Sequence, residues 1–475
     1  MAIAVKNDDS SSGLSNARQD STILHHTWTI VPSRTCGERE LRLGRLKTCG
    51  MTATHPCFAE YSIDQPVALN DAERLKSCAT IDRRAQAISR TREVTALKVG
   101  ILAHLLDIRP GYRQAGVSRY IEFLVDALPS ASSDTFVVYV GPHAGSTLPR
   151  RAGIRWARGR LPTATPEVRI AWEQLIAPSL LARDGIDVVH APVNVSPHFT
   201  KRPTVVTVHD LAFRLYPEQY PGLKRRYLDA LTRRSVEQAD QVIAVSENTR
   251  TDLLRSYRVN PERVHVVPNG VDPTLRPIED AEVLARFRAR QQLPDQFILA
   301  LSTLQPRKNL IALLRAWARL DAASRLPLVV AGAPGWKVDP IFDEARALGI
   351  ADKVRFAGYA AGDELALWYS AATLFVYPSL YEGFGLPVLE AMVCGTPVVS
   401  SNSSSLPEVA GDAALLVDPR DVDGLAGAID RLAHDQNLRA DLANRGIERA
   451  RQFSWARTAR ETVEVYRLAA AGRKD

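Results

Sequence analysis

From residue 96 onward, the chain alternates apolar runs of strand length with segments in which apolar residues recur at helical spacing. The first run covers residues 96–106, and helical spacing follows over residues 117–128. A strand that is apolar on both faces has to be covered on both faces, which is typical of parallel sheets flanked by helices. The sequence therefore predicts an α/β fold built on parallel sheets.

This alternation occurs in two series, separated by a stretch with Pro and Gly over residues 268–294. The first series predicts strands over residues 96–106, 135–140, 187–190, 203–209, 241–246 and 265–267, and helices over 117–128, 167–183, 222–238 and 247–257. The second predicts strands over residues 297–302, 327–331, 354–357, 373–377 and 397–400, and helices over 308–320, 340–348, 363–371 and 386–394. Two such series predict two facing Rossmann-like domains, with a ligand cleft at the carboxyl ends of their strands.

Residues 1–95 differ from the rest of the 475-residue chain, because they show no sustained period of two or of 3.6 residues. We expect this segment to be a mostly disordered extension. The alternative is that this segment is not part of the native protein and that translation starts later, for example at Met51. The remaining boundaries that we expect are a domain over residues 96–275, a domain over residues 276–455 and a terminal helix over residues 456–475.

The composition excludes several classes of protein. The chain is 45% hydrophobic and 24% charged, as globular proteins are, and no window offers the roughly 18 apolar residues of a membrane-spanning helix. The N-terminus lacks the apolar core of a secretory signal, so we expect a cytoplasmic location. The five cysteines form no close CxxC pair, which argues against zinc. The net charge of +7 suits phosphate ligands or an anionic membrane, but the basic residues are not interleaved with aromatics as in nucleic-acid-binding proteins.

The segment YEGFGLPVLE, residues 381–390, follows a predicted strand and begins a predicted helix. Gly383 and Gly385 allow the backbone to approach a ligand, and the helix N-terminus adds partial positive charge that suits a phosphate or sugar oxygen. Glu382 and Glu390 bracket this turn, and Glu390 can accept two hydrogen bonds from a vicinal diol. Spacing alone also allows a glycine-rich turn with solvated glutamates.

Two other strand ends carry candidate ligand groups. Arg307 and Lys308 stand at the expected start of a helix, where the helix dipole disfavours cations, and a bound diphosphate would resolve that conflict. The strand over residues 203–209 ends in His209 and Asp210, and His209 could donate to a sugar hydroxyl or phosphate oxygen. Solvated cations and a structural histidine are the alternatives.

Together these segments resemble the retaining glycosyltransferases of family 4, which have the GT-B fold of two facing Rossmann-like domains. The resemblance covers about residues 97–470 and rests on six motifs in family order: Ala115-Gly116-Val117-Ser118-Arg119-Tyr120, His209-Asp210, Ser246-Glu247-Asn248, Pro268-Asn269-Gly270-Val271-Asp272, Pro306-Arg307-Lys308-Asn309 and Glu382-x7-Glu390 with its Gly-Phe-Gly centre. The chain departs from the family in two places. Ser302-Thr303 stands where many members have Gly-Arg, and Ala115 stands where many have Gly.

The resemblance implies a role for each site residue. Glu390 would bind the donor ribose, and the two candidate catalytic residues, Glu382 and His209, would lie beside the transferred sugar. The other donor-binding residues would be Gly116, Arg307, Lys308, Gly383, Phe384, Gly385 and Leu386. The family needs no metal, so we expect none. The domain over 96–275 would face the acceptor, the domain over 276–455 would bind the nucleotide sugar, and the terminal helix would cross back to the first of them.

The reaction implied is retaining transfer of a hexose from a nucleotide-diphosphate sugar to a glycan or lipid-linked acceptor in surface polysaccharide synthesis. The runs HDLAFRLYPEQYP and TLQPRKN look like those of bacterial mannosyltransferases, so GDP-mannose leads among the donors and other nucleotide sugars follow. No further cofactor is expected. A nucleotide-sugar epimerase of the same fold and a non-catalytic nucleotide-sugar-binding protein are the alternatives.

Basic residues gather on the predicted helix over residues 222–238. They are Lys224, Arg225, Arg226, Arg233 and Arg234. We expect this helix to bring the protein into peripheral contact with the anionic inner face of the membrane. The alternative is a solvated helical face.

Overall fold

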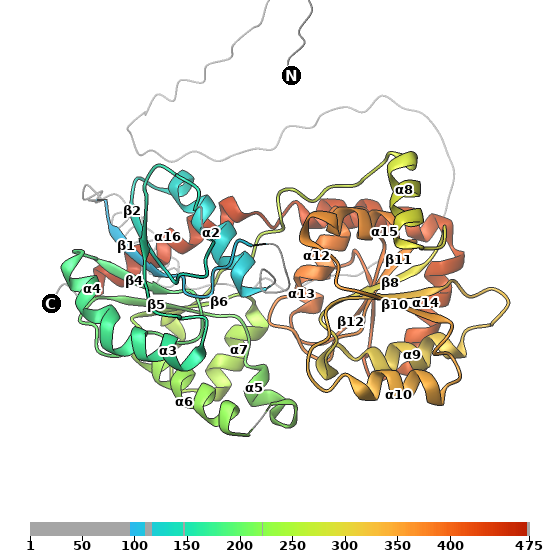
Figure 1. Cartoon of the computed structure of the whole chain (residues 1–475), viewed down its shortest axis with the longest axis horizontal. Coiled ribbons are helices and arrows are strands. Elements are labelled where there is room, and N and C mark those ends of the chain that lie inside the picture. The colour runs from blue at the N-terminus through green and yellow to red at the C-terminus, as the bar shows by residue number, and fades with distance from the viewer. Residues whose placement is uncertain (1–95, 110–115, 146–147, 221, 473–475) are drawn as a thin grey trace, which may run out of the picture. The chain divides into compact units, whose positions relative to one another are not determined.

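A computed structural model of the chain describes residues 96–109, 116–145, 148–220 and 222–472 (Figure 1). Its contacts divide the chain into two units, Met1–Arg90 and Thr91–Asp475, and the fold described below is that of the second. The predicted extension over residues 1–95 lies outside the described residues.

The described residues form two parallel sheets, and each is covered by helices. The first sheet has seven strands in the order β3-β2-β1-β4-β5-β6-β7. Its strands are β1 (Lys98–Leu102), β2 (Thr135–Val140), β3 (Ile154–Arg158), β4 (Val188–Ala191), β5 (Thr204–Val208), β6 (Gln241–Ala244) and β7 (Val264–Val266). Its helices are α2 (Val117–Ala131), α3 (Pro166–Ala171), α4 (Ala177–Arg183), α5 (Ala212–Leu215), α6 (Gly222–Gln238) and α7 (Glu247–Ser256). We call this sheet with these helices the first domain.

The second sheet has six strands in the described part of the chain, in the order β10-β9-β8-β11-β12-β13. Its strands are β8 (Ile298–Leu301), β9 (Leu328–Ala331), β10 (Val354–Gly358), β11 (Leu374–Tyr377), β12 (Val398–Ser401) and β13 (Leu415–Val417). Its helices are α8 (Ala281–Gln291), α9 (Leu310–Arg319), α10 (Asp339–Ala347), α11 (Leu365–Ala371), α12 (Leu386–Val393), α13 (Leu406–Ala410), α14 (Val422–His434) and α15 (Gln436–Ala450). This is the second domain.

The predicted α/β class with two parallel sheets is confirmed, and central strands of both sheets are buried along their whole length. Every residue of β5 (TVVTV) and of β9 (LVVA) is buried. Two strands, β3 and β13, were not predicted. β3 (IRWAR) lies at the edge of its sheet and is half exposed, so it lacks an apolar run, and β13 is a three-residue strand at the edge of the second sheet.

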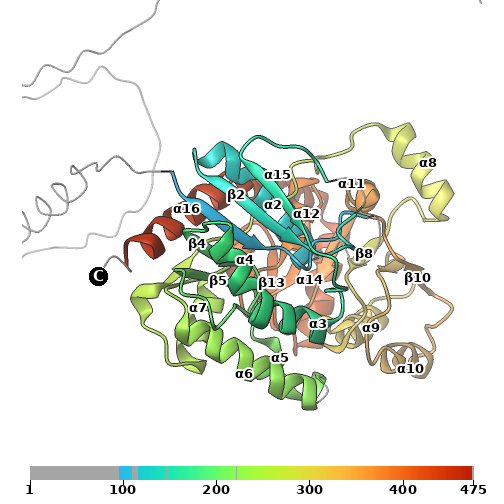
Figure 2. The same cartoon turned by 60° about the vertical axis from the view of Figure 1, so that its left-hand side comes forward.

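The last helix, α16 (Trp455–Ala471), packs against the first domain although it follows the second in sequence. Its buried residues Ala459, Val463 and Tyr466 join the apolar core formed with α2 and β1. Figures 1 and 2 both show this helix beside the first sheet. The Tyr466 hydroxyl also lies 2.8 Å from Nδ1 of the buried His190. The chain therefore connects the two domains twice, once on leaving the first and once on returning to it.

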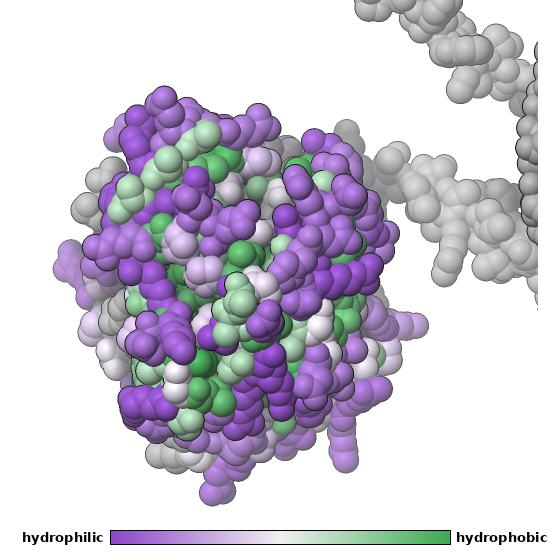
Figure 3. Space-filling view, turned by 90° about the vertical axis from the view of Figure 1, so that its right-hand side faces the viewer, coloured by the Kyte–Doolittle hydropathy of each residue, from purple (hydrophilic) through white to green (hydrophobic). Residues whose placement is uncertain are grey.

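The face of the molecule that Figure 3 shows is largely polar. Hydrophilic residues cover most of the face in Figure 3, and apolar residues show only in small areas between them. Among the described residues, no helix combines the length and the apolar character needed to cross a membrane.

Candidate active site between the two domains

The loop after β11 owes its shape to glycine. Gly385 is the N-cap of α12 and has a φ of 110°, which side chains rarely adopt. A Cβ at Gly385 would also lie 2.6 Å from Leu406. Pro387 follows in the first turn of α12, where its missing N–H costs no hydrogen bond. Local sequence thus sets the tight strand-to-helix turn that carries Glu382 and Glu390.

The Glu382 carboxylate is buried and fully partnered. Its Oε1 accepts hydrogen bonds from Lys308 Nζ at 2.6 Å, the Tyr377 hydroxyl at 2.9 Å and the Ser379 hydroxyl at 2.6 Å, and its Oε2 accepts from Arg307 Nη1 at 2.8 Å. Burial alone would raise the pKa of Glu382, but the charges of Arg307 and Lys308 outweigh burial and lower that pKa to about 2. Glu382 is therefore an anion throughout the physiological range.

This arrangement changes the interpretation of the two adjacent cations. Arg307 and Lys308 lie in a short 3-10 turn, Pro306–Lys308, and α9 begins only after Asn309. The anion between them in the structure is the carboxylate of Glu382, so a diphosphate is not required to explain their position. Burial lowers the pKa of Lys308 to about 8, against the opposing effect of Glu382. Both side chains remain charged at neutral pH, and their role toward a diphosphate remains a prediction.

Glu390 lies on α12 and contacts the first domain. Its Oε1 accepts from Arg119 Nη1 of α2 at 3.3 Å, and its Oε2 accepts from the Tyr369 hydroxyl of α11 at 3.0 Å. Only 7% of Glu390 is exposed. The Arg119 guanidinium also pairs with Asp272, in the segment between β7 and α8. The binding of a donor ribose by Glu390 remains a prediction.

His209 follows β5 and is held by its own domain. Its Nε2 donates to the Pro192 carbonyl at 2.8 Å, and its ring meets the edge of the Tyr120 ring, with centroids 4.6 Å apart. Burial lowers the pKa of His209, so the ring is neutral at neutral pH. With Nε2 carrying the proton, Nδ1 can only accept. In this arrangement His209 would accept a hydrogen bond from a sugar hydroxyl, whereas the sequence suggested that it donates one. Asp210 caps the next turn through the Ala212 amide at 3.0 Å.

The first domain contacts the glycine-containing loop directly. The Gly383 carbonyl accepts from the hydroxyls of Ser246 at 2.7 Å and Thr249 at 3.1 Å. Next to it, Glu408 of α13 accepts from the backbone amides of Glu247 and Asn248 at the N-terminus of α7, at 2.8 and 2.6 Å. The Ser246-Glu247-Asn248 motif therefore holds the loop against the first domain.

Gly383 fits closely against the strand end that carries His209. A Cβ at Gly383 would lie 1.7 Å from the His209 carbonyl oxygen and 2.9 Å from Cβ of Asp210. Only glycine allows this approach. The loop that bears Glu382 and the strand end that bears His209 are thus in direct contact through Gly383, and the catalytic role of the two residues remains a prediction.

The donor-binding residues that the sequence named also include Gly116. It precedes α2 with a φ of 62° and has nothing within 4 Å of an added Cβ, so its glycine serves the backbone conformation. Residues 110–115 of the same loop lie outside the described residues. The backbone of Phe384 and Leu386 lies in the turn between Glu382 and α12.

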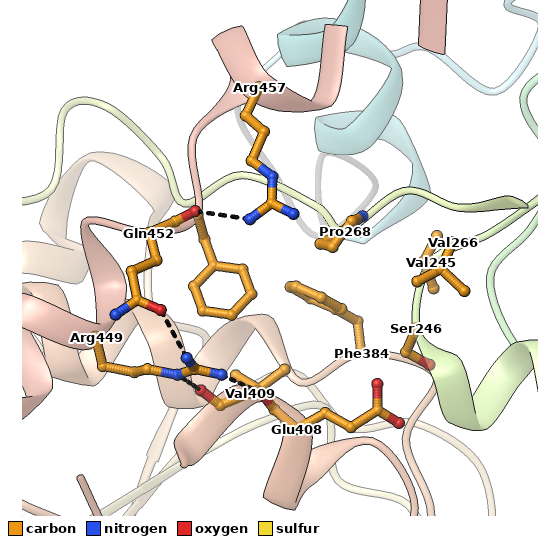
Figure 4. A pocket seen from close by; sticks show the side chains of 11 residues that line it. Val245, Ser246, Val266, Pro268, Phe384, Glu408, Val409, Arg449, Gln452 and Arg457 are labelled. Atoms are coloured by element: carbon orange, nitrogen blue, oxygen red, sulfur yellow. Dashed lines mark hydrogen bonds between the residues drawn. The ribbon is translucent and has the colours of Figure 1, made fainter. Parts of the chain in front are cut away.

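A pocket of about 210 Å³ adjoins Phe384. It is lined by Ser246, Pro268, Phe384, Glu408, Arg449 and Phe453 among others (Figure 4). Neither Glu382 nor Glu390 lines it. The Arg449 guanidinium already donates hydrogen bonds there to the backbone carbonyls of Glu408 and Val409.

The described residues contain no group of three or more His, Cys, Asp or Glu side chains placed to hold a metal ion. Asp421, which forms an Asp-x-Asp sequence with Asp423, caps α14 by accepting from the Gly424 amide at 2.8 Å. That a transfer reaction here needs no metal remains a prediction.

Sequence reasoning did not single out four residues that hold the two glutamates. Two of them are tyrosines, Tyr369 in a predicted helix and Tyr377 in a predicted strand, where aromatic side chains suggest core packing. The third, Ser379, comes just after that strand. Arg119 was noted only as part of a motif. A cation in the first turn of a helix is disfavoured by the helix dipole, so Arg119 could have suggested an acidic partner. Nothing in the sequence near Arg119 identifies that partner as Glu390.

The chain is similar to known glycosyltransferases. Two family models match, "Glycosyl transferases group 1" over residues 285–449 and "Glycosyltransferase Family 4" over residues 115–275. The chain is 36% identical over 289 residues to O-antigen chain mannosyltransferase B of Escherichia coli, covering 60% of this chain and 76% of that protein. It is 33% identical over 275 residues to the serotype-specific mannosyltransferase WbdA of Escherichia coli, covering 55% of this chain but only 33% of WbdA.

Solved structures show the same fold. Sucrose-phosphate synthase from Thermosynechococcus elongatus superposes with a TM-score of 0.65 at 23% identity, covering 79% of this chain and 100% of that one. HepE from Anabaena, solved in complex with UDP-glucose, gives a TM-score of 0.59 at 20% identity, covering 78% and 98%.

Proposed function

Because this chain belongs to the glycosyltransferases of group 1 and family 4, we propose that it transfers mannose from GDP-mannose to a glycan or lipid-linked acceptor, with retention of anomeric configuration. Membership of this family favours sugar transfer over the epimerase alternative. Mannose is supported by the mannosyltransferase relatives. The observation that carries the proposal is the placement of two buried glutamates around one turn: Glu382 in the turn, paired with Arg307 of its own domain, and Glu390 on α12, in contact with Arg119 of the first domain.

The proposed donor site uses the groups on this turn. Glu390 would accept hydrogen bonds from the ribose diol, and the N-terminus of α12 with the amides of Gly383, Phe384 and Leu386 would face the diphosphate and sugar. Lys308 and Arg307 lie beside Glu382, where charge would develop on the leaving group. Donor binding would therefore rearrange the contacts that these cations now make with Glu382.

The proposed reaction exchanges one bond at the anomeric carbon for another. The bond from that carbon to the diphosphate oxygen breaks, the acceptor hydroxyl oxygen bonds to the same face, and its proton passes to the departing phosphate oxygen. Positive charge develops on the sugar ring and negative charge on the diphosphate. The anionic Glu382 and the accepting Nδ1 of His209 would orient sugar hydroxyls beside that carbon, while Arg307 and Lys308 stabilise the diphosphate.

Donor binding is measurable as thermal stabilisation. We expect GDP-mannose at about 100 times its Kd to raise the free energy of unfolding by about 2.7 kcal/mol, and we expect Glu390→Ala to remove most of that gain. Glu344→Ala, which breaks an exposed ion pair with Arg315 in the same domain, is the matched control and should keep it. Full stabilisation of the Glu390→Ala variant by GDP-mannose would refute the donor site. Stronger stabilisation by UDP-sugars than by GDP-mannose would show that the donor carries uracil instead of guanine. Turnover of donor with acceptor would exclude a non-catalytic binding protein.

We also propose that the first domain contacts the inner, cytoplasmic face of the membrane. On α6, Arg226, Arg233 and Arg234 are exposed. The guanidinium of Arg234 lies 5.7 Å from the ring centroid of Phe199, which is 64% exposed. Leu175 is 73% exposed and lies in the segment Trp172–Ile176, whose Glu173 acts electrostatically on Tyr227 of α6. Cations beside exposed apolar side chains are the combination that binds anionic lipid interfaces.

Flotation with vesicles tests the membrane contact. We expect the protein to float with phosphatidylglycerol vesicles at low salt and not with phosphatidylcholine vesicles. Each cation near an anionic surface contributes about 1 kcal/mol, so Arg225→Glu with Arg226→Glu should weaken binding at least about tenfold. The matched control reverses Arg445, on α15 of the second domain, and Arg451, the C-cap residue of that helix. Equal loss in both double variants would point to net charge alone and refute a specific face.

A further inference from the structure

Arg119 links three parts of the molecule through one guanidinium. It projects from the first turn of α2, pairs with Asp272 between the domains, and donates to Glu390 Oε1 of α12 at 3.3 Å. Only 17% of its side chain is exposed, and the Glu390 side chain is 9% exposed. Fixing a long cationic side chain in a buried place costs conformational entropy and hydration, and interactions with its partners have to offset that cost. Arg119 is therefore a fixed part of the surroundings of Glu390.

Several titratable groups face Glu390 from the elements packed around it. They are Tyr369 of α11, Tyr377 of β11, Asp272 of the interdomain segment, Cys394 at the end of α12 and Arg119 of α2. Of this set, only Arg119 is a cation. Asp272 is a second anion nearby, but it also accepts from the Thr274 amide at 2.8 Å and the Thr274 hydroxyl at 2.7 Å. The charge of Glu390 therefore depends on Arg119.

We infer that Arg119 is a positioning residue that keeps the Glu390 carboxylate ionised and oriented to accept hydrogen bonds from the ribose diol of the donor. This inference rests on the proposed function, because it takes Glu390 as the ribose ligand. Arg119 holds Oε1 and Tyr369 holds Oε2. A carboxylate offers about four acceptor positions, so each oxygen retains a lone pair for a ribose hydroxyl. The first domain thereby takes part in binding the nucleotide, although the residues that would contact the nucleotide lie on the second domain.

The direction of the pH effect follows from the charges. Burial raises the pKa of Glu390, and Arg119 acts in the opposite direction. Without Arg119, the pKa of Glu390 rises further, and the carboxyl group takes up a proton at higher pH than before. A protonated carboxyl group accepts fewer hydrogen bonds. Donor affinity in such a variant is therefore lost at a pH where the unmodified protein still binds, and is regained as the pH is raised.

The test is the Kd of GDP-mannose and of UDP-glucose, which share the ribose diol, measured by calorimetry on the full chain from mildly acidic to mildly alkaline pH. For Arg119→Met we expect weaker binding toward the acidic end of this range, by up to about tenfold for each unit by which the pKa of Glu390 rises, and recovery at alkaline pH. Arg119→Lys restores the charge and should regain part of the affinity. Adding Arg119→Met to Glu390→Gln should have no further effect, because no carboxylate remains to be kept ionised.

Two controls separate this inference from the site on which it rests. Arg151→Met removes an exposed ion pair with Asp126 of α2, the helix that bears Arg119, and should leave affinity unchanged. Normal binding by Glu390→Gln overturns both the donor site and the role of Arg119. Weak binding by Glu390→Gln with normal or tighter binding by Arg119→Met overturns the role of Arg119 alone. A loss in Arg119→Met that is equal at every pH indicates a structural tie and also overturns the inference.

Discussion

Replacing Lys308 with methionine is expected to lower kcat for sugar transfer by about 10²–10³-fold, the usual effect of removing one group that stabilises developing charge in a buried site. Nζ of Lys308 lies 2.6 Å from Glu382 Oε1 and 2.6 Å from the Tyr377 hydroxyl, with Lys308 only 9% exposed. Its pKa of about 8 leaves it charged at neutral pH. The measurement is release of the nucleotide diphosphate, with the donor that stabilises the protein best.

The same substitution is also expected to destabilise the fold, so stability and catalysis have to be separated. Lys308→Met leaves the buried Glu382 with one cation fewer, which should lower the free energy of unfolding by about 3 kcal/mol. Adding Glu382→Gln removes the poorly compensated charge. We expect the double variant to regain most of the stability in denaturant unfolding and none of the kcat. If activity returned together with stability, the ion pair would be structural only.

Replacing Gly383 with alanine is expected to reduce kcat/KM by at least about 10²-fold, because a shift of about 1 Å in a catalytic site has that effect. The added Cβ would lie 1.7 Å from the His209 carbonyl oxygen and 2.7 Å from its carbonyl carbon. Both are backbone atoms that cannot rotate away, so the loop bearing Glu382 has to move from the first domain. Such overpacking also costs about 1–3 kcal/mol of stability, which thermal unfolding would measure.

The matched control for this variant is Gly427→Ala. Gly427 lies within α14, and nothing comes within 4 Å of an added Cβ. Alanine there should raise stability by up to about 1 kcal/mol, because glycine disfavours the helix interior, and should leave activity unchanged. Wild-type activity in Gly383→Ala would mean that the two domains need not approach each other at this loop for catalysis.

The sequence alone predicted the two parallel sheets and the turn that carries the two glutamates. Strands such as β5 and β9 consist mostly of apolar residues with no alternation of polar ones, and this pattern predicts burial on both faces. The turn after β11 was predictable for a similar reason. Its glycines and proline act on their own backbone, within a few residues of one another. The edge strand β3 was missed because it is half exposed and has no apolar run, and β13 was missed because it is only three residues long.

Only the tertiary structure decided which charges meet. Arg307 looked like a cation awaiting an external anion, but its partner in the structure is Glu382, 75 residues further along the chain. Arg119 meets Glu390 across 271 residues, and Ser246 meets Gly383 across 137. Periodicity and turn chemistry are encoded locally, so a sequence displays them. Pairings over such distances arise only when two sheets and a returning α16 bring separate strand ends together, and no local pattern records them.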